Sequence, residues 1–243
     1  MTTQSTRPVG PPVPNWTPPP APDGGTQAPL FQGRYARLEP LNADAHAAVL
    51  FRAYEGEDWL WDYMPYGPFH SAAQYHRWVR DTVANPDHLF YAIRDLETGA
   101  WGGVASYLRI APAAGSIEVG NLNFAPCLQR TRAATEAMAL MMGWAFDAGY
   151  RRYEWKCNAL NMPSRRAAQR LGFSYEGIFR QHLVVKGHNR DTAWFAVTDG
   201  DWPALRSAYE AWLDPSNFTA DGTQKERLSD LTQLVRVSSD PGL

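Results

Sequence analysis

Residues 158–173 read Asn-Ala-Leu-Asn-Met-Pro-Ser-Arg-Arg-Ala-Ala-Gln-Arg-Leu-Gly-Phe and carry the signals of a short helix that follows a strand. Asn161 is a suitable N-cap, and Gly172 can adopt the left-handed conformation that ends a helix. Arg165 and Arg166 lie near the start of this helix, where the dipole is positive and acidic residues are normally favoured. A bound anion would compensate both charges, so the pattern predicts an anion-binding turn.

The preceding helix begins in the same way. Residues 129–135, Gln-Arg-Thr-Arg-Ala-Ala-Thr, place Arg130 and Arg132 at its start, and the first carboxylate is Glu136. For a single turn of this kind, exposure of both arginines to solvent is the alternative explanation, and taken alone it is slightly favoured. Two successive basic turns, each leading from a strand into a helix, predict the opposite walls of one anion-binding cleft, with phosphate as the favoured anion.

Strand-like and helix-like segments alternate along the rest of the chain, and Asn42 and Ser71 are suitable N-caps for its first two helices. We expect strands at 35–41, 88–94, 101–110, 116–124, 153–157, 173–185 and 191–198, and helices at 43–55, 72–84, 131–148, 162–171 and 202–213. This order predicts an α/β fold, a single domain with a mixed, mostly antiparallel central sheet and helices on both faces. No Gly-x-Gly-x-x-Gly follows a strand, which argues against a dinucleotide-binding fold.

Composition excludes several classes of protein. The 243 residues have a net charge of −2, which provides no general attraction for nucleic acid or an anionic membrane. No apolar stretch is long enough to span a bilayer, and no segment has the pattern of a secretion signal. Two cysteines, Cys127 and Cys157, form no disulfide framework, and the six histidines show no metal-ligand spacing. We expect a cytoplasmic protein with no metal, no nucleic-acid partner and no membrane partner.

The two ends differ from the middle of the chain. Residues 1–30 are rich in proline and predict an extended arm, either a ligand for a partner domain or a tail whose Trp16 docks on its own domain. Residues 31–213 form the expected domain. Residues 214–243 are a C-terminal extension in which residues 225–235 have the spacing of a short helix, before an end that reads as disordered.

Three segments carry a family resemblance when they are taken together. Residues 117–126, Ile-Glu-Val-Gly-Asn-Leu-Asn-Phe-Ala-Pro, resemble a central strand, residues 129–134 resemble a pyrophosphate loop, and residues 158–173 closely match an Asn-x-x-Asn-x-x-Ser segment that ends in Gly-Phe. In this order and spacing they are similar to the GCN5-related N-acetyltransferases, in the branch that acetylates the N-termini of ribosomal proteins. The resemblance covers about residues 33–198. One position departs from it, because Arg132 stands where the loop has a glycine.

The resemblance implies roles for individual residues. Glu118 is the implied general base, acting through water on the substrate ammonium, and Ser164 is implied to protonate the leaving thiolate. Alternative roles are a salt bridge for Glu118 and helix capping for Ser164. Backbone N–H groups at Leu122, Asn123 and Phe124 are implied to polarise the carbonyl and hold the pantetheine arm. The other implied contacts to coenzyme A are Gln129, Arg130, Thr131, Arg132, Ala133, Ala134, Thr135, Asn158, Asn161 and Arg165.

The acceptor side of the site is expected between the first two helices. This segment is rich in aromatic residues, and the candidates for substrate binding are Trp59, Trp61, Tyr63 and Tyr66. Aromatic walls with Glu57, Asp58 and Asp62 would suit a cationic amine or a peptide N-terminus. A loop that packs into the core is the alternative interpretation.

The resemblance thus implies an N-acetyltransferase that moves an acetyl group from acetyl-CoA, as co-substrate, to a primary amine. The leading acceptor is the α-amino group of a protein or peptide, and a small-molecule amine is the alternative. Arg132 in the loop also leaves open a protein that binds acyl-CoA without catalysis. Both acceptors are compatible with the sequence, and so are a monomer and a homodimer.

Overall fold

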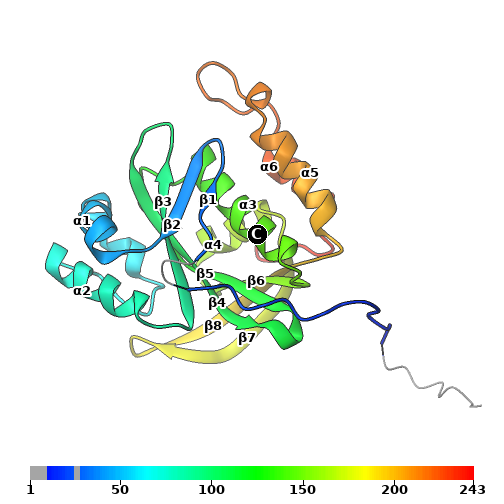
Figure 1. Ribbon diagram of the computed structural model, residues 1–243, viewed down its shortest axis with the longest axis horizontal. Coiled ribbons are helices and arrows are strands. Elements are labelled where there is room, and N and C mark those ends of the chain that lie inside the picture. Colours follow the sequence, from blue (N-terminus) through cyan, green and yellow to red (C-terminus); the bar gives the residue numbers. More distant parts are fainter. Residues whose placement is uncertain (1–9, 25–27) are drawn as a thin grey trace, which may run out of the picture.

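The computed structural model describes residues 10–24 and 28–243, and its centre is one eight-stranded sheet (Figure 1). The strand order is β1-β2-β3-β4-β5-β6-β8-β7, and every neighbouring pair is antiparallel except β5 and β6. This is the single α/β domain with a mixed, mostly antiparallel sheet that the sequence predicts. The strands are β1 (Phe31–Gln32), β2 (Ala36–Pro40), β3 (His88–Asp95), β4 (Trp101–Ala111), β5 (Ser116–Phe124), β6 (Arg152–Asn158), β7 (Ser174–Val185) and β8 (His188–Thr198).

The helices begin and end at the residues whose chemistry marks them. Asn42, Ser71 and Thr131 each accept a backbone N–H bond as N-caps, and Gly172 adopts the expected left-handed conformation at φ +92°. The α-helices are α1 (Ala43–Tyr54), α2 (Ala72–Val83), α3 (Arg132–Asp147), α4 (Met162–Arg170), α5 (Trp202–Leu213) and α6 (Leu228–Thr232); short 3₁₀ turns are η2 (Asp58–Trp61), η3 (Pro112–Ala114) and η4 (Pro215–Asn217). None of the helices in the described residues has the length and apolarity of a membrane span.

Two hydrophobic cores lie on opposite faces of the sheet. The larger core joins α3, α4 and α5 to side chains such as Tyr107, Ile117 and Phe195. The smaller core joins α1 and α2 to Phe90 and Val104 of β3 and β4. Helices therefore cover both faces, with α1 and α2 on one side of the sheet and α3 on the other (Figure 1).

The parallel pair β5 and β6 separates partway along its length. Their register runs from Ser116 opposite Arg152 to Val119 opposite Trp155, whereas β5 continues to Phe124 and β6 to Asn158. The separation begins beside a bulge in β5, where the register against β4 shifts and Asn121 has φ +51°. The bulge bends β5 away from β6 and leaves a gap at the middle of the sheet.

The C-terminal extension differs from its expected form. The helix covers only Leu228–Thr232, and the expectation of a disordered end is wrong. Asp240 is 3% exposed and forms an ion pair with Arg165, with Oδ2 2.6 Å from Nε. Arg236 also donates to the carbonyl of Gln169 at 2.7 Å. These contacts join the C-terminal residues to residues of α4 about seventy positions earlier in the sequence, and they hold the end of the chain against the domain.

The described part of the N-terminal arm, residues 10–24 and 28–30, includes a docked tryptophan. The Trp16 indole N–H donates to the carbonyl of Gly149 at 3.3 Å, and Arg151 lies over its ring at 5.6 Å. The Tyr150 hydroxyl donates to the carbonyl of Pro20. These contacts agree with the tail interpretation of Trp16, while the rest of the arm, residues 1–9 and 25–27, lies outside the described residues.

The buried Arg165–Asp240 pair yields a stability prediction. Asp240→Asn leaves the Arg165 guanidinium buried without its counter-charge, so we expect the free energy of unfolding to fall by about 3 kcal/mol. Urea denaturation measures this change. Asp230→Asn, at an exposed position in α6, is the matched control and should change stability by less than about 0.5 kcal/mol. Equal changes in stability in the two variants would contradict a stabilising role for the Arg165–Asp240 ion pair.

His46 yields a prediction of pH dependence. Burial lowers the pKa of His46 below its ordinary value of 6.5, although Glu39 acts in the opposite direction, and its Nδ1 accepts the N–H of Asn42. Below pH 6.5 the unfolded chain binds a proton that the folded protein resists, so stability is lost as the pH falls. His46→Asn should make the loss between pH 6.5 and 5.5 shallower in urea denaturation, whereas the same change at the exposed His188 should not.

Candidate active site

A cavity of about 300 Å³ lies where β5 and β6 separate. Its walls come from β3, β4, β5, β6, β7, β8, the start of α4 and the segment after η2, so segments distant in sequence meet there. Among the residues expected to act in catalysis or binding, the lining residues are Tyr63, Glu118, Leu122, Asn158, Asn161 and Ser164. The cavity is also lined by His88, Arg109, Lys156 and Arg190, for which no motif in the sequence indicates a role.

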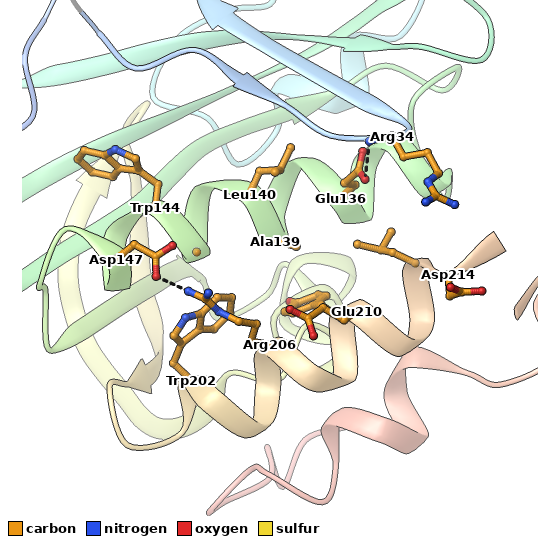
Figure 2. A pocket seen from close by; sticks show the side chains of 13 residues that line it. Arg34, Glu136, Ala139, Leu140, Trp144, Asp147, Trp202, Arg206, Glu210 and Asp214 are labelled. Atoms are coloured by element: carbon orange, nitrogen blue, oxygen red, sulfur yellow. Dashed lines mark hydrogen bonds and ion pairs between the residues drawn. The ribbon is translucent and has the colours of Figure 1, made fainter. Parts of the chain in front are cut away.

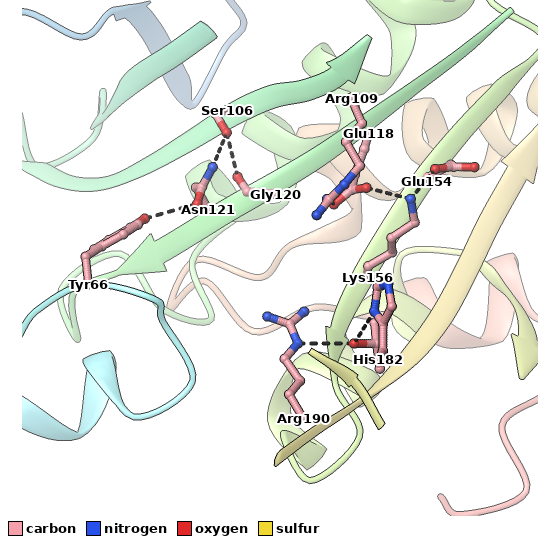
Figure 3. A network of polar contacts seen from close by, with 11 residues as sticks. Tyr66, Ser106, Arg109, Glu118, Gly120, Asn121, Glu154, Lys156, His182 and Arg190 are labelled. Carbon is pink, nitrogen blue, oxygen red and sulfur yellow. Dashed lines mark hydrogen bonds and ion pairs between the residues drawn. The ribbon is translucent and has the colours of Figure 1, made fainter. Parts of the chain in front are cut away.

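Glu118 is the centre of an ion-paired group on the cavity wall (Figure 3). The side chain is 2% exposed; its Oε1 accepts from Arg109 Nη1 at 2.7 Å, and its Oε2 lies 2.8 Å from Lys156 Nζ. Lys156 also donates to Glu154 at 2.6 Å. The salt bridge considered from the sequence is therefore present, and the carboxylate still faces the cavity. The alternation of β6 puts Glu154 and Lys156 on one face, which is the signal that could have identified them.

Ser164 lies at the start of α4 and lines the same cavity. Its Oγ accepts the indole N–H of Trp155 at 3.1 Å, and its backbone N–H donates to Oδ1 of Asn161 at 3.1 Å. Asn161 therefore acts as the N-cap, and Ser164 has no capping role. Cys157 lines the cavity nearby, and burial raises the pKa of its thiol. Asn158 also braces this turn, because its Oδ1 accepts the N–H of Leu160.

The end of β5 is held by side chains from other elements. Tyr54 donates to the carbonyl of Asn123 at 3.0 Å, and Gln129 donates to that of Phe124 at 2.7 Å. At the bulge, Asn121 donates to Ser106 Oγ and accepts from Tyr66 (Figure 3). Of the three residues expected to offer N–H groups here, Leu122 lines the cavity and the Asn123 side chain is buried.

The turn into α3 offers free backbone donors. Thr131 Oγ1 caps the N–H of Ala134 at 3.0 Å, and in the described chain the N–H groups of Arg130, Arg132 and Ala133 have no acceptor. Arg130 has φ +63°, and its exposed side chain forms no ion pair with a described residue. Three free N–H groups within four residues at a helix start form a site for an anion such as phosphate, while the intervening N–H of Thr131 donates to the carbonyl of Leu128.

Three other side chains expected to contact coenzyme A have structural partners. Arg132 is ion-paired with Glu97 and lies 4.8 Å from the ring centroids of both Tyr35 and Phe218. Arg165 is paired with Asp240. Thr135 is buried and accepts from Arg170 at 3.1 Å. The arginine that replaces glycine at position 132 thus packs its side chain against aromatic rings, and the backbone N–H of Arg132 stays free.

The four aromatic candidates on the acceptor side have different environments. Tyr63 lines the cavity and donates to the carbonyl of Leu160, and Tyr66 reaches the bulge. Trp61 is 3% exposed in the smaller core, and Trp59 is 53% exposed, and neither lines the cavity. The acidic residues of this segment, Glu57, Asp58 and Asp62, are not among the lining residues either.

A second cavity of about 510 Å³ lies between α3 and α5 (Figure 2). Two of its carboxylates already have partners within the protein. The Glu136 carboxylate accepts the N–H groups of Arg34, Tyr35 and Ala36 at 2.6–2.9 Å, and Asp147 is ion-paired with Arg206. None of the residues expected to act in catalysis lines this cavity, so the gap between β5 and β6 is the candidate active site.

Known proteins with the same arrangement fall into one family. Residues 36–174 match the model of the "Acetyltransferase (GNAT) domain". A GCN5-related N-acetyltransferase from Brucella melitensis is 47% identical and superposes with a TM-score of 0.86 over 91% of this chain and 100% of that one. A probable acetyltransferase of the same family from Chromobacterium violaceum is 39% identical, with a TM-score of 0.74 over 83% and 100%.

A more distant structure shares the fold. The microcin C7 self-immunity acetyltransferase MccE, in complex with acetyl-CoA and AMP, is 18% identical and has a TM-score of 0.60 over 68% of this chain and 93% of that one. No curated protein matches this chain in sequence.

Proposed function

The chain belongs to the GNAT acetyltransferase family, and we propose that it transfers an acetyl group from acetyl-CoA to the α-amino group of a protein or peptide. The observation that carries the proposal is the gap between β5 and β6. It places a carboxylate and a hydroxyl in the lining of one cavity, and the turn into α3 offers three free N–H groups.

Acyl transfer from a thioester requires a neutral amine, a polarised carbonyl and a protonated leaving thiolate. We assign the first task to Glu118, which would accept the ammonium proton through a water molecule. We assign the third to Ser164. Its Oγ already accepts the Trp155 indole N–H, so its own hydrogen is free to be donated into the cavity. The pantetheine arm would lie along the exposed edge of β5 as an added strand.

The phosphates of coenzyme A would lie at the start of α3. The free N–H groups of Arg130, Arg132 and Ala133 and the unpaired Arg130 guanidinium support this placement. The Arg132 side chain packs over Tyr35 and Phe218, which supports a phosphate site at this turn despite the missing glycine; a protein that binds acyl-CoA without catalysis is still an alternative. A small-molecule amine remains the alternative acceptor, because the cavity accommodates a group of that size.

Calorimetric titration with acetyl-CoA tests the cofactor site. We expect saturable binding at one site, and Arg130→Glu should weaken it about tenfold by replacing a phosphate contact with repulsion. Arg77→Glu, at an exposed position in α2 on the other face, is the matched control and should bind like the wild type. Charge reversal at Arg132 or Arg165 is avoided, because it would break their ion pairs. Absence of binding up to millimolar acetyl-CoA would refute the proposed function.

Steady-state release of the coenzyme A thiol, measured with a panel of peptide amines, tests the catalytic roles. Glu118→Gln removes the proton acceptor, so we expect kcat to fall about a hundredfold or more while acetyl-CoA binding is retained. Ser164→Ala should lower kcat by a smaller factor. Glu210→Gln, at an exposed position in α5 that has no ion pair in the described chain, is the matched control. A kcat within threefold of the wild type in Glu118→Gln would exclude the carboxylate as base.

A further inference from the structure

Arg190 is a half-buried cation of the active-site cavity with no carboxylate partner. It lies on β8, and its Nε donates to Thr192 Oγ1 at 3.2 Å (Figure 3). Thr192 is 1% exposed and also lies 3.0 Å from His182 Nδ1, so the support of this guanidinium is fixed. In the described chain its two terminal nitrogens have neither a hydrogen-bond acceptor nor an ion pair.

The cavity has more positive than negative groups. Arg109, Lys156 and Arg190 line it together with one carboxylate, Glu118, which already contacts the first two. Burial lowers the pKa of His88, so this residue adds no charge at neutral pH. Burial also lowers the pKa of Arg190, and Arg109 acts in the same direction, whereas Cys157 and Glu118 act in the opposite one. A half-buried cation without a partner is unfavourable, and a bound anion would compensate it.

The phosphates of coenzyme A do not supply this anion. Ala193, Phe195 and Val197 of β8 point into the core beneath α3, so Arg190 and Thr192, which alternate with them, point to the opposite face of the sheet. The free N–H groups at the start of α3 lie on the face of the sheet that carries the larger core. Arg190 therefore lies on the face from which an acceptor would approach.

We propose that Arg190 binds a carboxylate of the acceptor, so that the amine that becomes acetylated lies next to an anionic group. This inference rests on the proposed acetyl transfer and defines the acceptor class. The ammonium group of such a zwitterionic acceptor faces Glu118, and its carboxylate faces the two free nitrogens of Arg190, which are suited to a bidentate contact. The carboxylate belongs either to a free amino acid or to an acidic first residue of a peptide.

Two matched pairs of acceptors distinguish these sources. L-Alanine is compared with L-alaninamide, and the amide of Asp-Ala-Ala with the amide of Asn-Ala-Ala, at saturating acetyl-CoA. In at least one pair, kcat/KM of the wild type should be about tenfold or more higher for the anionic member, as expected for a charged hydrogen-bonded contact. Preference in the first pair identifies the α-carboxylate, and preference in the second identifies the acidic side chain. Turnover without preference in either pair overturns the proposal.

Arg190→Gln then assigns the preference to this residue. The variant should raise KM for the anionic member about tenfold, leave the neutral member within twofold, and bind acetyl-CoA like the wild type. Arg180→Gln, at an exposed position in β7 outside this cavity, is the matched control and should keep the preference. An equal loss for both members in Arg190→Gln overturns the assignment.

A binding measurement needs no turnover. The protein saturated with coenzyme A is titrated with sulfate, because coenzyme A then occupies the phosphate site at α3. We expect millimolar binding that weakens at least about tenfold in Arg190→Gln and is unchanged in Arg180→Gln. Equal sulfate affinity in wild type and Arg190→Gln overturns the proposal. Failure of the proposed acetyl transfer is seen separately, as absence of acetyl-CoA binding.

Discussion

The separation of β5 from β6 is the constraint on which the site depends. The two strands are parallel neighbours only as far as Val119 and Trp155, and the bulge at Asn121 turns β5 away. Beyond that point β5 pairs only with β4 and β6 pairs only with β8, and the cavity occupies the space between β5 and β6. Tyr54, Tyr66 and Gln129 hold the bent end of β5 by hydrogen bonds to its carbonyls and to the Asn121 side chain. The gap is therefore a property of the sheet, supported by elements on both of its faces.

A buried charged group at the middle of a sheet requires an opposite charge, and here the charged side chains form a continuous series of ion pairs. Glu118 contacts Arg109 and Lys156, Lys156 contacts Glu154, and Glu154 contacts Arg152. Each charge has an opposite charge beside it, which limits the desolvation cost of placing them between strands. Arg190 lines the same cavity and has no ion pair with a described residue, and this difference is the basis for proposing that it binds a ligand.

The arginines at the helix starts illustrate where sequence reasoning stops. Their number and spacing indicate an anion, and in the turn into α3 the free N–H groups are present as expected. Two of these arginine side chains nevertheless form ion pairs with carboxylates of the protein itself. Arg132 pairs with Glu97, and Arg165 pairs with Asp240 near the C-terminus. A pattern read over seven residues cannot include partners that lie 35 and 75 positions away.

The sequence by itself determined the order and type of nearly all elements, because caps and periodicity act over a few residues: Asn42, Ser71 and Gly172 mark helix ends wherever the helices pack. It also singled out Glu118 and Ser164 as candidates, and both line one cavity. Tertiary structure alone decided which arginines are free, that Trp61 belongs to the core, and that the residues around Asp240 are ordered. The reason is physical: burial and charge pairing depend on neighbours that only the folded sheet brings together.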